Sequence, residues 1–234
     1  MPDSYREKIY AKYVDTYTQT YKQNLSKEYP RRKRLYDFNY KSLLPESPMF
    51  KIAELGCGPG FFLKYLEENG YKNCIGVDRS PQQIAAALEL GVTQVVQSNI
   101  FSFLRDTGEP FDIICAFHVI EHLYKDEILE LMELINTRLS PSGIVLLEVP
   151  NAGSPLLGGS NRYSEFTHEV GFTPSSLREI MLVSDFYRVQ VYPVKDTSPY
   201  ARLFFGVMNY FLHSRFAMDA YFEGGLIGIG YKKN

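Results

Sequence analysis

Short apolar runs alternate with amphipathic stretches along this chain from residue 50 onward. The apolar runs predict strands at 50–55, 74–78, 93–97, 111–117 and 144–149. The spacing of apolar residues between them predicts helices at 60–69, 81–90 and 124–139. Strands and helices that alternate in this way favour a parallel sheet with helices on both faces. The run at 111–117 is apolar almost throughout, so we expect it to form a central strand.

Beyond residue 150 the alternation is interrupted by a long loop. Residues 150–173 are rich in glycine, proline and asparagine, and a loop of this length inside a compact domain is usually functional. A helix is predicted at 174–183, with Thr173 as its N-cap, and strands are predicted at 187–194 and 226–231. The last strand can pair antiparallel with the strand before it.

The segment between these two strands is dense in aromatic residues, chiefly at 199–222. It can form a hydrophobic cap or a dimer face, or it can lie on a membrane with Arg202 and Arg215 at its edges. We expect buried packing, because exposed aromatic patches are rare in soluble monomers.

The first 45 residues are rich in tyrosine and charge. Four of the tyrosines share one helical face: Tyr10, Tyr13, Tyr17 and Tyr21. We expect a helical cap that packs this stripe on the domain, and the alternative is a lid whose phenols contact a substrate. The basic run at 31–34 predicts a solvated helix face rather than a phosphate site. The predicted division is a cap at 1–45 and one domain at 46–234.

Composition adds limits on partners and compartment. The formal net charge is −2, which gives no electrostatic case for a nucleic-acid partner. Cys57, Cys74 and Cys115 lie in apolar surroundings without paired spacing, which favours buried thiols in a cytoplasmic protein. The start of the chain lacks the apolar core of a signal peptide, and no apolar run has the length of a membrane span.

A glycine-rich turn follows the first predicted strand. Gly56, Gly58 and Gly60 follow G-x-G-x-G spacing, and Phe61 stands where a dinucleotide fingerprint has its third glycine. Glu54, two residues before the first glycine, suits a ligand with an ammonium or sulfonium and would sit badly beside a pyrophosphate. The turn therefore favours S-adenosylmethionine over NAD.

Polar side chains also end the next three strands. Asp78 can accept hydrogen bonds from ribose hydroxyls, although an acid there can also cap the following turn. Asn99 can pair with an adenine edge while Ile100 packs on the face of the ring. If the segment after the fourth strand turns helical, His118, Glu121 and His122 share one face.

Four motifs together resemble class I S-adenosylmethionine-dependent methyltransferases. They are Glu54-Leu55-Gly56-Cys57-Gly58-Pro59-Gly60, Gly76-Val77-Asp78, Phe111-Asp112-Ile113-Ile114 with Glu121-His122-Leu123, and Leu139-Ser140-Pro141-Ser142-Gly143. The resemblance covers about residues 50–150 and implies a Rossmann-like, doubly wound α/β sheet of seven strands, six parallel and the last antiparallel. We expect 46–234 to form the methyltransferase domain, and 150–173 and 195–224 to build the acceptor site.

The resemblance also implies the cofactor contacts. The residues expected to bind S-adenosylmethionine are Glu54, Gly56, Cys57, Gly58, Gly60, Asp78, Arg79, Asn99, Ile100, Phe117 and His118. Glu54 would hold the glycine loop and the ammonium, and Asp78 the ribose. Asn99 replaces the family's usual aspartate at the adenine amino group, where an amide oxygen can accept the same hydrogen bond.

The loop after Pro150-Asn151 resembles a bacterial subgroup that acts in polysaccharide, quinone and secondary-metabolite pathways. Its Arg162…Thr167-His168…Phe172-Thr173-Pro174 stretch carries this resemblance, which suggests O-methylation with a sugar or sugar-nucleotide acceptor. Asn151, Arg162 and Tyr163 are the expected acceptor contacts; for Arg162 the alternative is pairing with a nearby glutamate.

His168 is the first choice for the base that takes the acceptor's proton, with Glu121 and His122 as further catalytic residues. The alternative for His168 is a histidine that orders its loop through backbone hydrogen bonds. Related quinone O-methyltransferases bind a divalent metal through Glu-x-x-Glu-His. Here His118 replaces the first glutamate, and we assign no metal.

Three alternatives to the sugar acceptor remain. The first is O-methylation of a small phenol or quinol, the second is a non-catalytic S-adenosylmethionine-binding protein, and a dehydrogenase is a remote third. The sequence identifies neither the acceptor nor the oligomeric state, and a homodimer is compatible with it.

Overall fold

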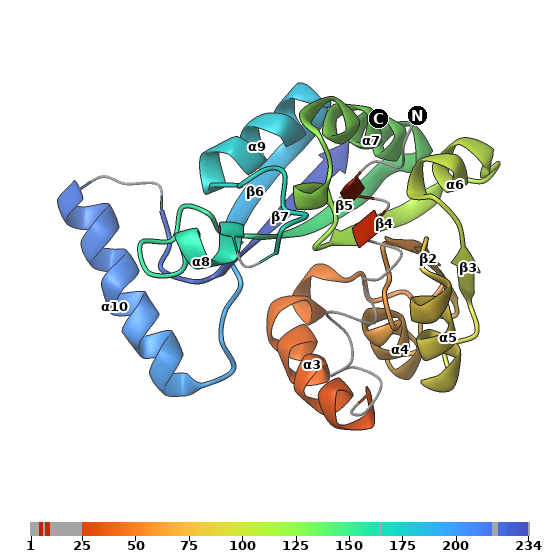
Figure 1. Cartoon of the computed structure of the whole chain (residues 1–234), viewed down its shortest axis with the longest axis horizontal. Coiled ribbons are helices and arrows are strands. Elements are labelled where there is room, and N and C mark those ends of the chain that lie inside the picture. The colour runs from red at the N-terminus through yellow and green to blue at the C-terminus, as the bar shows by residue number, and fades with distance from the viewer. Residues whose placement is uncertain (1–4, 7, 10–24, 164, 217–219, 234) are drawn as a thin grey trace.

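One seven-stranded sheet organises the molecule (Figure 1). The computed structural model describes residues 5–6, 8–9, 25–163, 165–216 and 220–233, so the predicted tyrosine stripe at 10–21 lies outside it. The strands are β1 (Lys51–Leu55), β2 (Asn73–Asp78), β3 (Val95–Gln97), β4 (Phe111–Phe117), β5 (Leu139–Pro150), β6 (Phe186–Pro193) and β7 (Gly225–Lys232). Their order is β3-β2-β1-β4-β5-β7-β6, and β7 is antiparallel to β5 and β6. This confirms the predicted doubly wound sheet.

Helices cover both faces of the sheet (Figure 1). One face carries α3 (Leu25–Asn39), α4 (Phe61–Glu68) and α5 (Pro81–Glu89), and the other carries α6 (Ile100–Asp106), α7 (Lys125–Arg138) and α9 (Pro174–Val183). Alternate residues of β4 enter the two cores: Ile113 and Cys115 face the α4 side, and Ile114 and Ala116 face the α7 side. The predicted central strand is therefore confirmed.

The structure differs from the sequence prediction mainly in short elements. Strand β5 begins at Leu139, five residues before the expected start, because the Ser-Pro-Ser-Gly stretch that ends α7 already lies in the strand. Helix α6 was not predicted, since seven residues are too few to show a helical period. The three cysteines are buried and unpaired, as expected.

The C-terminal end of α3 is fastened to a distant part of the chain. The Asn39 side-chain amide donates to the Lys195 carbonyl at 3.0 Å, and its oxygen accepts from the Lys195 backbone N–H at 2.8 Å. Beyond α3, Tyr40 is 1% exposed and its ring lies 4.8 Å from that of Phe117. The described part of the predicted cap, chiefly α3, is thus helical and joined to the sheet.

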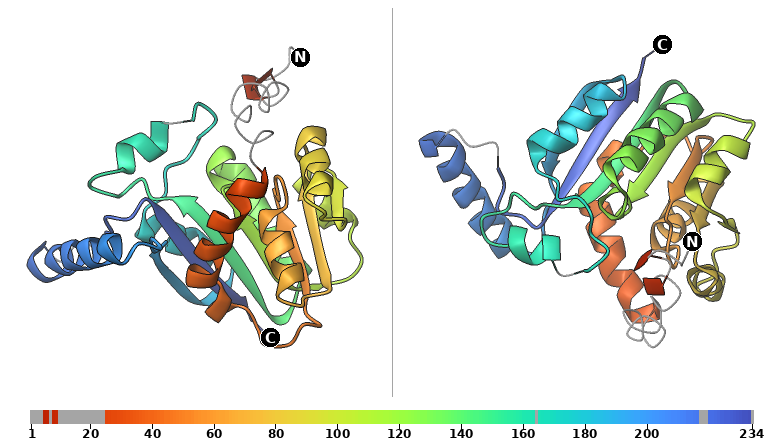
Figure 2. Two further views of the ribbon diagram at one scale, coloured as in Figure 1. Left: turned by 90° about the horizontal axis from the view of Figure 1, so that it is seen from below. Right: turned by 45° about the horizontal axis from the view of Figure 1, so that its top comes forward.

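Helix α10 (Pro199–Phe216) fills the aromatic segment between β6 and β7 and projects away from the sheet (Figure 2). The burial expected for this segment is found along one side only, where Leu212 packs with Ala220 and Phe222. Along the rest of the helix the large apolar side chains are exposed, because no other described element covers them. Among the described helices, none is long and apolar enough to cross a bilayer.

Candidate active site

A cavity of about 910 Å³ opens at the carboxyl ends of β1, β2 and β4. Strands β1 and β4 are neighbours, and the chain proceeds from them to opposite sides of the sheet. Ligands of doubly wound folds bind at such a reversal of strand order. Eleven of the residues predicted to act line the cavity: Glu54, Gly56, Cys57, Gly58, Asp78, Arg79, Asn99, Ile100, Phe117, His118 and His122.

The glycine turn has a shape that side chains would prevent. Gly56 has a φ of +69°, and a Cβ there would lie 2.5 Å from Cγ2 of Val119. Gly60, which is not part of the cavity wall, has a φ of +73° and begins α4 as its N-cap. The turn therefore exposes backbone to the cavity, which is what a nucleotide-like ligand needs for close approach.

Glu54 is a buried carboxylate on the cavity wall. It is 4% exposed, and its Oε2 has no hydrogen-bond partner among the described residues. Burial raises the pKa of this carboxyl well above its usual range, and the nearby charge of Asp78 raises it further. An unpartnered buried carboxylate suits a ligand cation, so this wall fits the ammonium of the expected cofactor.

Asp78 braces the glycine turn. Its Oδ2 accepts from the Gly58 backbone N–H at 2.9 Å, and its Oδ1 accepts from the Ser80 backbone N–H at 2.8 Å. Each oxygen retains a second acceptor site, so contact with ribose hydroxyls stays possible. Burial raises the pKa of Asp78, although the two backbone donors oppose this shift.

Asn99 lines the cavity, but its side chain has a different partner from the one expected. Its Oδ1 accepts from the Phe101 backbone N–H at 2.8 Å and from Ser102 at 3.4 Å, which makes Asn99 the N-cap of α6. The oxygen predicted to bind the adenine amino group is therefore engaged in capping.

His118 bridges two carboxylates on the cavity wall. Its Nδ1 lies 3.3 Å from Glu121 Oε1, and its Nε2 lies 3.1 Å from Glu148 Oε1. The His118 side chain is 47% exposed. Partial desolvation lowers its pKa, but the two carboxylates outweigh this effect and raise the pKa to about 10. The Tyr40 hydroxyl donates to the other oxygen of Glu148, so this network connects the residue after α3 to β5 and the cavity.

His122, in the short helix η2 (Ile120–His122), also lines the cavity. Thr167 donates its hydroxyl proton to Glu165 at 3.1 Å, so its oxygen can only accept from Nδ1 of His122, 2.9 Å away. Nδ1 therefore carries the proton, and Nε2 keeps its lone pair. Burial lowers the pKa of His122 and keeps the ring neutral near neutral pH.

His168 lies beside His122, with ring centroids 4.8 Å apart, but it is 9% exposed and is not part of the cavity wall. Its Nδ1 lies 2.9 Å from the Asn161 carbonyl, and its Nε2 lies 3.7 Å from Glu165. These contacts match the alternative in which His168 orders its loop. Its assignment as the base stays a prediction.

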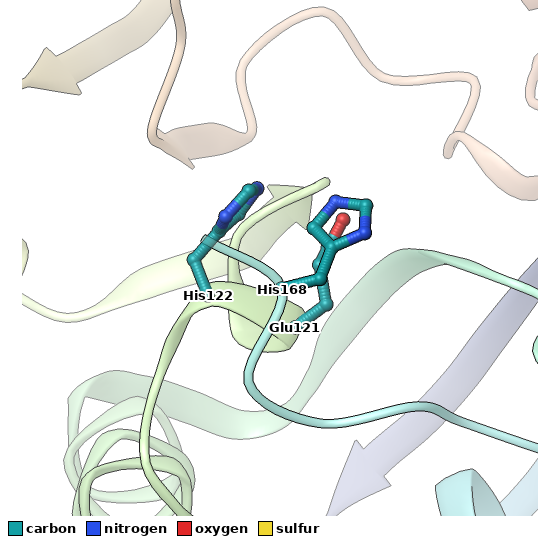
Figure 3. A group of neighbouring side chains, drawn as sticks. All are labelled: Glu121, His122 and His168. Carbon is teal, nitrogen blue, oxygen red and sulfur yellow. The ribbon is translucent and has the colours of Figure 1, made fainter. Parts of the chain in front are cut away.

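Figure 3 shows Glu121 and His122 on η2 with His168 approaching from the loop. Donor atoms of the three residues lie within 4.8 Å of one another, a spacing that a divalent ion can bridge. Glu121 is 1% exposed, and its backbone carbonyl accepts from the N–H groups of Glu169 and Val170. The loop is thereby docked on η2. The assignment of no metal stays a prediction.

The three predicted acceptor contacts lie away from the cavity wall. Asn151 is fully buried, and its amide donates to the carbonyls of Tyr221 and Glu223. Arg162 donates to the carbonyls of His168 and Glu169, rather than to a carboxylate. These two side chains are engaged in backbone hydrogen bonds that hold their loops, and Tyr163 is 81% exposed.

Several cavity residues were missed because they come from elements without a motif. The cavity wall also includes Arg6, Arg32, Tyr36, Gln82, Gln83, Phe101, Tyr124 and Glu127. Arg32 belongs to the basic run at 31–34, which was interpreted as a solvated face. Gln82 and Gln83 could have been found, because they open the helix that follows Asp78.

His118 predicts a pH dependence of stability. Because its pKa is raised to about 10 in the folded protein, the charged ring stabilises the fold fully below pH 6.5 and progressively less as the pH rises toward 10. His118→Gln does not titrate, so the Tm difference between wild type and variant should be largest near pH 6.5 and shrink toward pH 10.

Thermal melts across this pH range measure the difference. His213→Gln, at an exposed position of α10, is the matched control and should show no comparable trend. A difference that stays constant or grows with pH would contradict the charged state assigned to His118.

Comparison with known proteins agrees with this geometry. Residues 10–191 match the model of a methyltransferase domain family. The ubiquinone biosynthesis O-methyltransferase of Azorhizobium caulinodans is 28% identical over 122 residues, which cover 50% of this chain and 47% of that protein. The enzyme of the same name from a Chelativorans strain is 30% identical over 112 residues, with 46% and 43% covered. The chain thus spans less than half the length of these two relatives.

A solved structure supports the fold. The S-adenosylmethionine-dependent methyltransferase of Archaeoglobus fulgidus superposes with a TM-score of 0.64 at 22% identity, over 86% of this chain and 92% of that one. The family match covers well over half of the chain and includes the glycine turn and the cavity. The chain therefore belongs to the methyltransferase domain family, as a class I S-adenosylmethionine-dependent methyltransferase.

Proposed function

We propose that this protein transfers the methyl group of S-adenosylmethionine to a hydroxyl of a small phenol or quinol, with His122 as the base. The observation that carries the proposal is the neutral His122 ring on the cavity wall, held by Thr167 and Glu165. When bound, the cofactor supplies an electrophilic methyl carbon, and the residues of the cavity position both reactants.

The cofactor end of the cavity lies at β1 and β2. Glu54 would hold the ammonium, the glycine turn would admit the methionine part, and Asp78 would hold the ribose. The free Oε2 of Glu54 and the positive φ of Gly56 and Gly58 support this placement.

The acceptor end lies at η2, where His122 accepts the hydroxyl proton on Nε2 as the acceptor oxygen attacks. A neutral phenol or alcohol is a poor nucleophile, so a base that is unprotonated at neutral pH increases the rate. Thr167 and Glu165 act as positioning residues, because they fix the His122 tautomer through Nδ1.

Aromatic side chains on the cavity wall favour a planar acceptor. Tyr36, Phe62, Phe101, Phe117 and Tyr124 all line it, and flat rings pack against one another with favourable geometry. The two ubiquinone-pathway relatives support the same class. Neither is named for a sugar, so the sugar acceptor expected from the sequence gains no support.

Methyl transfer from labelled S-adenosylmethionine to a panel of quinols, phenols and nucleotide sugars tests the acceptor class. We expect turnover with a quinol or phenol. Transfer to nucleotide sugars alone would reinstate the sugar acceptor. No transfer to any of them, with S-adenosylhomocysteine still bound, would favour the non-catalytic alternative.

Replacing His122 or His168 by glutamine distinguishes the residue that acts as the base from the residue that holds the loop. His122→Gln should lower kcat about 100-fold or more while S-adenosylhomocysteine affinity is kept, because only the proton acceptor is lost. Thr167→Val should lower kcat less, since the ring remains but its tautomer is no longer fixed.

The matched variant, His168→Gln, should mainly lower Tm, because it loosens the contacts to Asn161 and Glu165. If His168→Gln instead loses as much kcat as His122→Gln at unchanged Tm, the base is His168.

Glu54→Gln should separate cofactor binding from stability. Loss of the carboxylate removes the partner of the ammonium, so S-adenosylhomocysteine affinity should fall about tenfold or more. The same change removes a buried carboxylate whose Oε2 has no partner, so the Tm of the ligand-free protein should rise. Calorimetric titration and thermal melts measure the two effects, and unchanged affinity would exclude Glu54 from the cofactor site.

A further inference from the structure

Helix α10 is attached to the rest of the protein along one side. Phe205 and Met208 pack with Leu212 against Ala220 and Phe222. Asn209 strengthens this attachment, because its amide donates to Glu223 at 2.8 Å and its oxygen accepts from the Phe222 backbone N–H at 2.9 Å. The helix is therefore held in a defined orientation, although it projects from the sheet (Figures 1 and 2).

The opposite side of α10 is apolar and uncovered. Its residues are Tyr200 (84% exposed), Leu203 (68%), Phe204 (51%), Val207 (59%), Tyr210 (74%) and Phe211 (49%). Spacings of three and four residues place these six side chains on one stripe of the helix. A helix that is apolar on both sides would normally be buried on both, so this outer stripe indicates an interaction surface.

A second group of exposed apolar residues lies in the loop after β5, which contains the short helix α8 (Gly158–Tyr163). Leu156, Tyr163 and Phe166 are 59%, 81% and 78% exposed. This loop follows the carboxyl end of β5, and α10 follows the carboxyl end of β6. Both groups therefore leave the sheet at the edge where the cavity opens.

The charges on α10 favour an anionic partner. Residues 199–216 contain no aspartate or glutamate, whereas Arg202, His213 and Arg215 are basic. This is a local exception in a protein whose formal net charge is −2. Tyrosine, phenylalanine and arginine together are the residues that favour the headgroup region of a bilayer, where rings are half-buried and guanidinium groups meet lipid phosphates.

We propose that α10 lies flat in the surface of a lipid bilayer that carries anionic lipids, with its outer stripe among the acyl chains near the headgroups. The bilayer covers the exposed stripe, and Arg215, beside the stripe at the end of the helix, lies at the level of the phosphates. Arg202 adds positive charge near the surface while its guanidinium stays bound to the carbonyls of Asp196 and Thr197 and to the Phe38 ring. This inference stands apart from the proposed reaction, because no described residue of α10 lines the cavity.

A second copy of the chain is a less suitable cover. In a two-fold symmetric pair of antiparallel α10 helices, Arg202 of one helix would approach the basic C-terminal turn of the other. With no acidic residue on either helix, these like charges would meet without compensation. An anionic bilayer compensates them.

Flotation of the purified full chain with phosphatidylcholine vesicles, with and without phosphatidylglycerol, tests the proposal. We expect the protein to float with the anionic vesicles, and Leu203→Glu/Val207→Glu to reduce the bound fraction about tenfold or more, because two carboxylates replace inserted apolar groups. Leu182→Glu/Val183→Glu is the matched control, since these α9 residues are 52% and 65% exposed. It should float like the wild type.

Three results would overturn the proposal. The first is a wild type that stays out of both kinds of vesicle, and the second is equal loss of flotation in both double variants. The third is a wild-type dimer in light scattering that Leu203→Glu/Val207→Glu converts to a monomer without any vesicle binding, which would assign the stripe to a second copy. Equal flotation with both vesicle types would disprove the requirement for anionic lipid.

Unchanged S-adenosylhomocysteine affinity in both double variants verifies that each is folded. The flotation experiment tests only the binding of α10 to a bilayer, and the methyl-transfer assays test only the proposed reaction. Either proposal can therefore be disproved without affecting the other.

Discussion

Four acidic side chains lie close together at the carboxyl end of the sheet: Glu54, Asp78, Glu121 and Glu148. The hydrogen bonds and the positive charge that stabilise them determine the arrangement of the cavity wall. Asp78 is satisfied by backbone N–H groups of the glycine turn, and the single ring of His118 serves both Glu121 and Glu148. Oε2 of Glu54 and Oε2 of Glu121 have no hydrogen-bond partner among the described residues. Of these two acids only Glu54 lines the cavity, so Glu54 is the one placed to meet a ligand cation.

The acceptor side is organised differently, through one loop instead of strand ends. Thr167 and Glu165 reach His122 from a segment whose backbone is docked on the Glu121 carbonyl. Orientation of the base therefore depends on the docking of the loop. The side chains of His168 and Arg162 contribute to catalysis in this view by holding that loop in place.

Apolar periodicity and the glycine turn are local signals, and they predicted the parallel sheet and the position of the ligand site. The seven strands with an antiparallel last strand came from the family resemblance, and the order of the strands was not predicted. Side-chain partners were less predictable. Asn99 was expected at the adenine, yet its oxygen caps α6, a helix too short to leave a periodic signal. His168 was preferred to His122 because loop position is visible in a sequence, whereas the hydrogen bond from His122 to Thr167, 45 residues away, is not. The high number of aromatic residues at 199–222 did not indicate which side of α10 packs against the protein and which side is exposed.

The fastening of Asn39 to Lys195 also constrains the order in which the protein can fold. The two residues are separated by 156 positions, and the Tyr40 hydroxyl must likewise wait for Glu148, 108 positions later. During synthesis α3 can form early as a local helix, but its last turn can be fixed only after β6 has been made and has left the ribosome. The cover that Tyr40 gives Phe117 needs only β4 and the Glu148 carboxylate of β5, so this side of the cavity wall can be fixed before β6 is made. The attachment of α3 beside it is completed later, when Lys195 becomes available. The cavity wall is therefore assembled from both halves of the chain, although its glycine turn follows the first strand.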